Sequence, residues 1–358
     1  MASAARRVLV VGDGCVGTYA ATTIAARHPR ASVVLKSRCG TTSDKTVVDS
    51  LCSSAGVRRL ESFAALRGGA QRAFDAVIVA TKTYDHAKAA AELRRAGVTA
   101  SRTLVVHNGM RDASVQFPGD ASTVVTPGGY MLPKASDGDP NILARVRQRD
   151  IAVKNPDAAW AVQPIEITAG GGGESDVAAE LLRESGFAVS GQFGYAALRK
   201  FLVNNTANLL SIVHDCNVDG LLKVPQRREQ MSELYDEAMC VLQAASAHDD
   251  PVVSAAVASL SGAHFDSLRV LPSGYGGDGS SASKFKAEVF DMIASYRKHY
   301  PSSHQDYTKG GRVEVDAFNG FVAKLAQRAS VAAPHNLKLA MDVDGKVAAK
   351  RAALYGAA

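Results

Sequence analysis

In residues 1–175, short apolar segments alternate with longer stretches of helix-favouring residues. The apolar segments are rich in Val, Leu and Ile and run over 7–11, 32–35, 75–80, 103–106 and 122–125. Runs of this length suit strands that are buried on both faces, and strands that alternate with helices form parallel sheets. The pattern predicts an α/β N-terminal domain, a doubly wound parallel sheet covered by helices on both faces.

The pattern changes after residue 175, where apolar positions recur at helical spacing over long stretches. Helices are expected over 178–184, 195–213, 227–247, 282–298 and 313–329. Strand-like runs are scarce in this part, so residues 176–358 are predicted to form an all-α second domain. A stretch rich in Gly and Ser at 271–281 is typical of a surface loop inserted between helices.

A glycine-rich turn follows the first apolar segment at once. It reads Gly12-Asp13-Gly14-Cys15-Val16-Gly17 and leads into alanine-rich, helix-favouring residues. In such a turn the first glycine permits the tight bend, the second lets a pyrophosphate approach the backbone, and the third lets the helix pack closely on the sheet. Free N–H groups at the helix N-terminus then favour phosphate. The segment predicts a Rossmann-type dinucleotide site, the alternative being a strand–turn–helix without a ligand.

The end of the second strand distinguishes between two dinucleotides. NAD-binding proteins usually carry Asp or Glu there, which holds the ribose hydroxyl. Here Lys36, Ser37 and Arg38 follow one another without an acid. A guanidinium is planar and permanently charged, and it can bind two phosphate oxygens at once. The sequence favours NADP (NADPH) over NAD, with Arg38 ahead of Lys36 as ligand of the 2′-phosphate, although a basic, solvated loop is the alternative.

Composition narrows the class of partner. The chain of 358 residues is 46% hydrophobic with a formal net charge of +6, which suits two globular domains and anionic ligands. Lys and Arg are scattered, so no nucleic acid is expected as a partner. No apolar span reaches membrane-helix length and no secretory leader is visible, so no membrane partner is expected. The five cysteines lack metal-binding spacing, which predicts reduced thiols, no metal and a cytoplasmic location.

Two groups of polar residues are candidates for chemistry. Lys82 and Asn108 follow the third and fourth apolar segments, and ligands of parallel sheets bind beyond the carboxyl ends of the strands. Lys200, Asn204 and Asn208 are spaced four residues apart and therefore share one face of a helix. Asn is a mediocre helix former, so this polar stripe in an apolar helix indicates a lined cleft. Taken singly, each of these side chains could equally be solvated or part of a turn.

Together these segments resemble the ketopantoate reductase (2-dehydropantoate 2-reductase) family. The resemblance covers nearly the whole chain, and its most specific part is the Lys-Asn-Asn stripe combined with an acidic segment that begins at Glu314. It is carried, in the family's order, by Gly12–Gly17, Arg38–Gly40, Ala80–Lys82, His107–Met110, Arg199–Asn204 with Asn208, Pro301–Asp306, Glu314–Gly320 and Ala333–Asn336. The resemblance implies an NADP-binding Rossmann-type domain and a helical C-terminal domain similar to that of 6-phosphogluconate dehydrogenase.

The resemblance also implies a reaction and a role for each residue. Hydride passes from NADPH to the keto carbon of a small 2-keto acid, and Lys200 acts as the general acid. Glu314 holds and tunes Lys200 or binds the substrate hydroxyl. The residues implied in substrate binding are Asn108, Asn204, Asn208, Ser302 and Lys82, of which Lys82 and Asn108 also line the cofactor.

The chain departs from the family pattern in two places. Ser302-Ser303-His304 stands where the family usually has Ser-Met-Leu, so either serine could bind the substrate carboxylate. The spacing to Glu314 favours Ser302, and His304 is expected to pack or to lie at the surface. The chain is also longer than a typical member, with the excess at 249–300. These departures leave the identity of the 2-keto acid open.

Two other readings of the chain stay open. A related NADP-dependent hydroxyacid or opine-type dehydrogenase would share the glycine turn and the helical domain, but should lack the acidic segment paired with Lys200. A non-catalytic NADP-sensing protein would tolerate loss of Lys200 and Glu314, and both residues are present. A homodimer is compatible with the sequence, which does not decide the oligomeric state.

Overall fold

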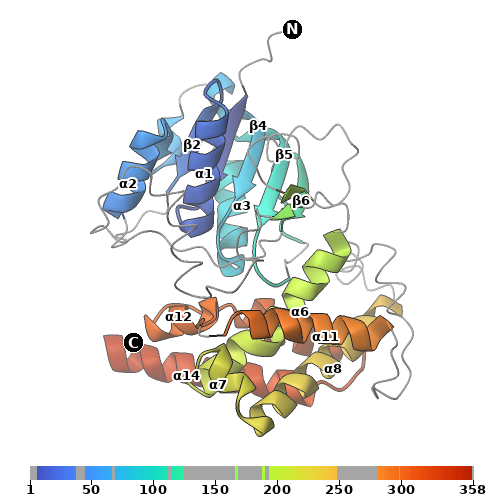
Figure 1. The fold of residues 1–358 in the computed structure, drawn as a ribbon. Coiled ribbons are helices and arrows are strands. Elements are labelled where there is room, and N and C mark those ends of the chain that lie inside the picture. The colour runs from blue at the N-terminus through green and yellow to red at the C-terminus, as the bar shows by residue number, and fades with distance from the viewer. Residues whose placement is uncertain are drawn as a thin grey trace. The chain divides into compact units, whose positions relative to one another are not determined.

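A computed structural model describes residues 6–37, 45–66, 69–110, 114–124, 166–167, 188–189, 193–247, 281–297 and 299–356. These residues fall into two compact units, of which the first contains 6–107 and 114–124 and the second contains 108–110 and 193–356 (Figure 1). The expected helix at 178–184, the loop at 271–281 and the domain boundary at 175 lie outside the described residues. Each unit is considered by itself.

The first unit is built on six parallel strands in the order β3-β2-β1-β4-β5-β6. These strands are β1 (Arg7–Val11), β2 (Ser32–Lys36), β3 (Arg58–Leu60), β4 (Ala73–Val79), β5 (Thr99–Val106) and β6 (Asp120–Val124). The order reverses between β1 and β4, which is where doubly wound sheets bind ligands. The predicted α/β doubly wound sheet is confirmed. Two further short strands, β7 (Glu166–Ile167) and β8 (Ala188–Val189), pair in parallel with each other.

Helices cover both faces of this sheet because successive strand side chains point to opposite sides. The helices are α1 (Cys15–Arg27), α2 (Lys45–Ser54) and α3 (His86–Arg95), with short 3-10 turns at Phe63–Ala65 (η1), Gly69–Arg72 (η2) and Thr83–Asp85 (η3). In β1, Val8 and Val10 join the apolar cluster that includes α1 and α2. Leu9 and Val11 join the opposite cluster, which includes α3. The apolar run at 7–11 is therefore buried on both faces, as predicted.

The sequence pattern does not predict β3 or α2. β3 is a three-residue strand that reads Arg58-Arg59-Leu60, so it offers no apolar run. It lies at the edge of the sheet, where charged side chains are common because they discourage pairing with another chain. β2 ends at Lys36, and Arg38 lies outside the described residues.

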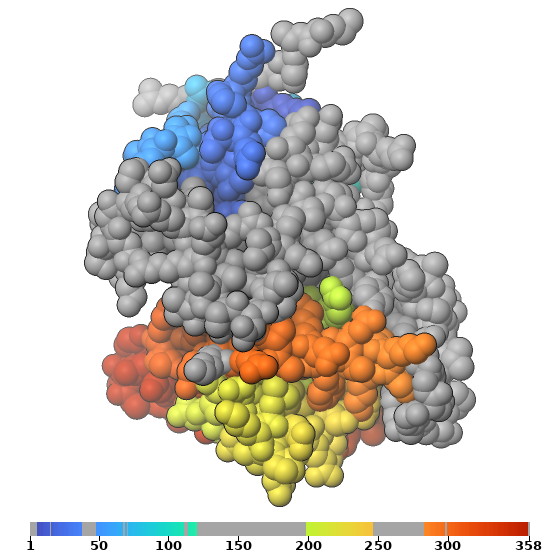
Figure 2. Space-filling model, in the orientation of Figure 1, coloured from blue at the N-terminus to red at the C-terminus, as the bar shows by residue number. Residues whose placement is uncertain are grey.

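The described elements of the second unit, apart from its short link at 108–110, are helical, as predicted. They are α6 (Phe193–Val213), α7 (Val218–Leu222), α8 (Pro225–Ala247), α11 (Ser281–Ser295), α12 (Ser302–Thr308), η6 (Val315–Ala317), α13 (Asn319–Arg328) and α14 (Pro334–Tyr355). Helix α6 is central, because residues 201–212 are all buried and α7, α8, α11, α12 and α14 pack against it. In the space-filling view, α11 in orange adjoins the yellow surface of α7 and α8 without a gap (Figure 2).

Two expected helices have different ends in the structure. The helix expected at 313–329 begins only at Asn319, because the backbone of Phe318 lies outside the helical region at φ −122° and ψ −107°. The helix expected at 282–298 ends at Ser295, and Arg297 adopts a positive φ of 34° two residues later. The sequence pattern also does not predict α12 or α14: α12 is only seven residues long, and α14 has exposed apolar side chains, among them Leu337 and Met341, that blur its amphipathic pattern.

Buried amides join four helices of the second unit. Asn205 of α6, Asn319 of α13 and Asn336 of α14 are fully buried. The Nδ2 atoms of Asn205 and Asn319 donate to Asn336 Oδ1 at 3.0 and 2.8 Å, and Asn336 Nδ2 donates to Glu237 Oε2 of α8 at 2.7 Å. Buried polar groups are costly unless they are paired, so this network fixes how these helices fit together.

We expect Asn336→Ala to lower the free energy of unfolding by about 2–4 kcal/mol, because it leaves the amides of Asn205 and Asn319 and the Glu237 carboxylate without their shared partner. Urea denaturation measures this loss. Lys338→Ala, on the exposed side of the same helix, is the matched control and should change stability by less than about 0.5 kcal/mol. Equal midpoints for the two variants would contradict a structural role for the network.

Candidate functional site

Two glycines of the turn after β1 let three backbone segments approach closely. Gly12 has a positive φ of 109°, and a Cβ atom there would lie 2.6 Å from the carbonyl oxygen of Ala80 at the end of β4. A Cβ atom on Gly17 would lie 1.8 Å from the carbonyl oxygen of Gly12. Both distances are far below van der Waals contact, so these positions require glycine. Gly12 and Gly17 therefore hold α1 tightly against the ends of β1 and β4.

Gly14 lies in different surroundings. It is exposed, and a Cβ atom placed on it would meet no atom of the described residues within 4 Å. Gly14 is also the N-cap of α1, and no side chain caps the helix there. The N–H groups in the first turn of a helix lack partners within the helix, so they favour an anion. The open space at Gly14 therefore fits the phosphates of a dinucleotide.

The residues after β4 lie beside this turn. Thr81 Cγ2 would be 3.1 Å from a Cβ atom on Gly12, and Thr81 Oγ1 is buried without a partner among the described residues. Lys82 is half-buried and is the N-cap of η3. The strand-end position predicted for Lys82 is confirmed. Thr81 could not be selected from the sequence, because its neighbour Gly12 lies 69 positions away in the chain.

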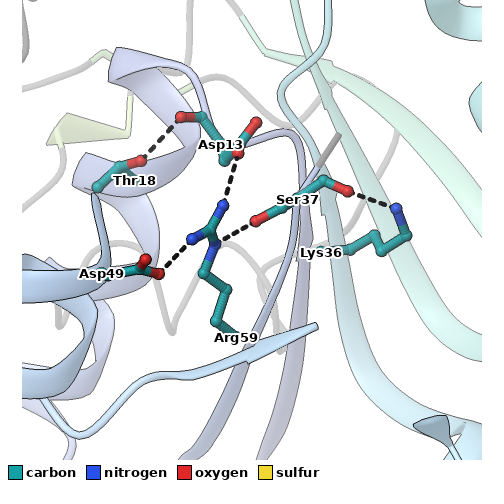
Figure 3. A network of polar contacts seen from close by, with 6 residues as sticks. All are labelled: Asp13, Thr18, Lys36, Ser37, Asp49 and Arg59. Carbon is teal, nitrogen blue, oxygen red and sulfur yellow. Dashed lines mark hydrogen bonds and ion pairs between the residues drawn. The ribbon is translucent and has the colours of Figure 1, made fainter. Parts of the chain in front are cut away.

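A polar network lies at the end of β2 (Figure 3). Ser37 is buried, and its hydroxyl accepts a hydrogen bond from Arg59 Nε of β3. The other guanidinium nitrogens of Arg59 contact Asp13 Oδ2 of the glycine turn at 3.4 Å and Asp49 Oδ1 of α2. Lys36 is buried and donates to the carbonyl of Ser37. Arg59 therefore joins the glycine turn, the end of β2 and α2.

The surroundings of Arg59 favour its charged form. Burial by itself would lower the pKa of the guanidinium, but the hydrogen bond to Asp49 and the charges of Asp49 and Asp13 raise the pKa above its ordinary value. Arg38 and Lys36 are the basic residues predicted for this end of the sheet. Arg59 is not predicted, because only the pairing of β3 with β2 brings it to Ser37.

In the second unit, the Lys-Asn-Asn stripe runs along the central helix α6. Asn204 and Asn208 are buried, and Lys200 is half-buried one turn before Asn204. The Lys200 ammonium lies 3.5 Å from the hydroxyl of Tyr296 and 5.5 Å from the centre of its ring. Tyr296 follows α11 directly and joins the candidate site through this contact, which the sequence could not predict because the two residues are 96 positions apart.

Several buried polar atoms on or near α6 have no partner among the described residues, and two of them belong to residues considered in the sequence for the site. One is Asn204 Nδ2, and the other is Ser303 Oγ on α12, which packs against α6. Ser302 is half-buried beside it, so both serines considered in the sequence lie at the start of α12. His304 is buried, and its Nε2 pairs with Asp215 Oδ1 at 3.0 Å. His304 therefore packs within the helical unit.

A short segment after β5 belongs to the helical unit. Asn108 is half-buried in it, and the next residue, Gly109, has a positive φ of 76°. Met110 N donates to the carbonyl of Ala317 at 3.0 Å, and a Cβ atom on Gly109 would lie 2.3 Å from the same oxygen. Ala317 is three residues after Glu314, which is 3% exposed. The structure thus anchors the segment of Asn108 against the segment that follows Glu314.

Within the described ranges, no cluster of three or more His, Cys, Asp or Glu side chains could hold a metal ion. None of the helices described has the length and apolar character needed to cross a membrane. Cys52, Cys216 and Cys240 are free thiols, and burial raises the pKa of the Cys52 thiol to about 11.

A glycine turn at the switch point of a six-stranded parallel sheet, combined with a helical second unit, defines a two-part protein of Rossmann-type fold. The family description "Ketopantoate reductase PanE/ApbA" matches residues 8–118, and "Ketopantoate reductase PanE/ApbA C terminal" matches residues 192–346. The chain belongs to the ketopantoate reductase family, which confirms the resemblance noted in the sequence.

Curated relatives match part of the chain. The 2-dehydropantoate 2-reductase of Lactococcus lactis is 28% identical over 169 residues, which are 46% of this chain and 45% of that protein. The Aquifex aeolicus 2-dehydropantoate 2-reductase is 25% identical over 138 residues, 38% of this chain and 35% of that protein. The chain thus spans less than half the length of these relatives.

Solved structures match the fold over nearly the whole chain. A PanE/ApbA family ketopantoate reductase from Ralstonia eutropha has a TM-score of 0.69 at 16% identity, covering 96% of this chain and 99% of that one. D-mandelate dehydrogenase in complex with NADH has a TM-score of 0.64 at 16% identity, covering 95% and 98%. A dimeric ketopantoate reductase from Staphylococcus aureus has a TM-score of 0.62 at 14% identity, covering 96% and 99%. At these identities the likeness shows the fold.

The two kinds of glycine should respond differently to a side chain. Gly17→Ala should destabilise the protein by more than about 1 kcal/mol, because its Cβ atom collides with the Gly12 carbonyl. Gly14→Val should fold with little loss, because the space beside it is empty, but it should abolish binding of NADPH and NADH. Thermal unfolding and calorimetric titration measure the two effects. Unchanged dinucleotide affinity in Gly14→Val would show that the phosphates bind elsewhere.

Proposed function

We propose that the protein reduces a small 2-keto acid with NADPH, and that its substrate is 2-dehydropantoate (ketopantoate), which becomes pantoate. In this reaction the keto carbon gains a hydride, and the carbonyl oxygen gains a proton. The observation that carries the proposal is the stripe on α6, where the Lys200 ammonium precedes a buried Asn204 amide that has no partner among the described residues. The family to which the chain belongs supports the same reaction.

The first unit fits the dinucleotide. Among the described residues, no atom fills the space beside Gly14, no side chain caps α1 and none binds the buried Thr81 hydroxyl, and all three features suit phosphate oxygens. In this proposal residues 12–17 hold the pyrophosphate, and Lys82 and Asn108 line the nicotinamide end. When bound, NADPH supplies the hydride. Arg38 is proposed to bind the 2′-phosphate, because no acid follows β2 to favour a ribose hydroxyl.

Lys200 is the proposed general acid. Its ammonium stabilises the negative charge that develops on the carbonyl oxygen and delivers a proton to it. The contact with Tyr296 restrains the long lysine side chain, which reduces the number of rotamers it must lose during the reaction. Glu314 is proposed to hold Lys200 or the substrate hydroxyl, and its deep burial suits a fixed carboxylate.

The proposed substrate contacts are polar and buried, as a small hydroxylated acid requires. Asn204 and Asn208 would bind the hydroxyl end of the substrate. Asn204 Nδ2 can donate a hydrogen bond to it, since this atom has no partner among the described residues. Asn108 and a serine of α12 would bind the carboxylate. Ser302 is favoured by its spacing to Glu314, and Ser303 brings a buried hydroxyl without a partner among the described residues. Lys82 would neutralise the carboxylate.

Two other functions are alternatives to the reduction of ketopantoate. The fold neighbour D-mandelate dehydrogenase was solved with NADH, so a related hydroxyacid dehydrogenase with another substrate is the second candidate. A non-catalytic NADP-sensing protein would give no turnover at all.

The dimeric enzyme from Staphylococcus aureus supports a homodimer. We also propose a cytoplasmic location and the domain division at residues 175 and 176.

A panel of 2-keto acids tests the proposed function directly. Loss of NADPH absorbance should be fastest with ketopantoate, and slower with phenylglyoxylate, the keto acid related to mandelate, and with simple 2-keto acids. NADH should support lower kcat/KM than NADPH. Preference for phenylglyoxylate would favour the hydroxyacid dehydrogenase. No turnover with any member of the panel would contradict an enzyme of this class.

Lys200→Ala should lower kcat by about 10²–10⁴-fold, the usual contribution of a positioned general acid, with NADPH affinity unchanged. Glu314→Ala should be less severe, and the double variant should lose less than the product of the two factors because the residues act together. Lys223→Ala, an exposed lysine of the same unit, is the matched control. Independent, multiplying losses would show that Lys200 and Glu314 do not form one site.

Arg38→Ala should weaken NADPH about ten- to a hundredfold, because a charge-assisted bidentate contact contributes about 1.5–3 kcal/mol. NADH, which lacks the 2′-phosphate, should lose little affinity. Isothermal titration with both cofactors measures the difference. Equal weakening of NADPH and NADH would refute the phosphate role of Arg38.

A further inference from the structure

The residue that follows β2 is the one that meets the 2′ position of the ribose in a Rossmann-type site. In this chain it is Ser37, which is 1% exposed and accepts a hydrogen bond from Arg59 Nε. Arg59 therefore lies one hydrogen bond from the point where NADP and NAD differ. It comes from β3, not from the loop that contains Arg38.

The two carboxylates around Arg59 are held in different ways (Figure 3). The Asp13 side chain is 8% exposed, and its backbone carbonyl accepts a hydrogen bond from Thr18 Oγ1 at 3.2 Å, so it is fixed in the glycine turn. The Asp49 side chain is 47% exposed on α2. Arg59 is only 14% exposed, so the Asp49 carboxylate can turn to solvent while the guanidinium stays in place for another anion, which then supplies the charge that Arg59 needs.

We propose that Arg59 is a second determinant of cofactor specificity, and that its guanidinium exchanges the Asp49 carboxylate for the 2′-phosphate of NADPH. The inference rests on the proposed use of NADPH. A phosphate monoester carries nearly two negative charges and three acceptor oxygens, and it therefore competes well with a single carboxylate for a guanidinium fork. The neutral 2′-hydroxyl of NADH cannot make this exchange.

The exchange assigns separate tasks to the groups around Arg59. Asp13 holds the guanidinium beside the glycine turn, so Arg59 and the loop proposed to bind the pyrophosphate keep a fixed position relative to each other. Ser37 holds Nε, which leaves the edge that faces Asp49 for the ligand. Asp49 neutralises the half-buried Arg59 when no phosphate is present, and it competes with the phosphate when NADPH binds.

Isothermal titration of NADPH and NADH into the full chain tests this inference with four variants. Arg59→Ala should weaken NADPH about ten- to a hundredfold and NADH less than about threefold. Arg59→Lys should recover part of the NADPH affinity, because it keeps the charge and loses the fork. Asp49→Asn should strengthen NADPH about two- to fivefold, because the competing charge is gone, and should leave NADH unchanged. Arg58→Ala is the matched control, since Arg58 is exposed on the same strand.

The outcomes separate this inference from the proposed function. If the wild-type protein binds NADPH no more tightly than NADH, the proposed cofactor is wrong and the inference fails with it. If the wild type prefers NADPH and Arg59→Ala keeps that preference, only the inference is overturned. Asp49→Asn does not depend on the Arg59 variants being folded, so weakened or unchanged NADPH binding in that variant also overturns the exchange. A tighter NADPH complex in Asp49→Asn supports it.

Discussion

The helical unit depends on one constraint, that a helix buried on every side cannot leave its polar side chains unpaired without a large cost. In helix α6, the adjacent residues Asn205 and Asn204 differ in how they meet this constraint. Asn205 is bound by Asn336, which also binds Asn319 and Glu237, and this network sets the rotation of α6 among its neighbours. With that rotation fixed, Asn204 is directed elsewhere, and its amide nitrogen finds no partner among the described residues. The unused donor of Asn204 is the group that the proposed substrate would bind, so a packing residue and a proposed binding residue are neighbours in this helix.

The nucleotide-binding unit applies a related principle to the backbone. Gly12 and Gly17 lie so close to neighbouring backbone that no side chain fits at either position, and these contacts hold α1 against the sheet. The same arrangement leaves the space at Gly14 empty and the first turn of α1 without a side-chain cap. The motif therefore combines two positions that are structural with one that is open to a ligand, although its three glycines look equivalent in the sequence.

Features that depend on near neighbours in the chain could be predicted from the sequence. The five apolar strands of the sheet, the glycine turn and the stripe of Lys200, Asn204 and Asn208 could be predicted from local sequence patterns, and the structure agrees with them. Features that depend on pairing between distant segments could not. Arg59 reaches Ser37 only because the short, polar strand β3 pairs with β2, and Tyr296 reaches Lys200 across 96 positions. The helix expected from residue 313 fails for the same reason, since Ala317 gives its carbonyl to Met110 instead of to a helical turn.

The proposed reaction transfers a hydride from NADPH to the keto carbon of ketopantoate, with the proton supplied by the protein. The most direct measurement uses NADPH that carries deuterium at both C4 positions, with the product examined by proton NMR and mass spectrometry. We expect one deuterium per product molecule, located on the carbon that bears the new hydroxyl, with solvent hydrogen on the oxygen. Pantoate without deuterium at that carbon, or cofactor oxidation without pantoate, would contradict it.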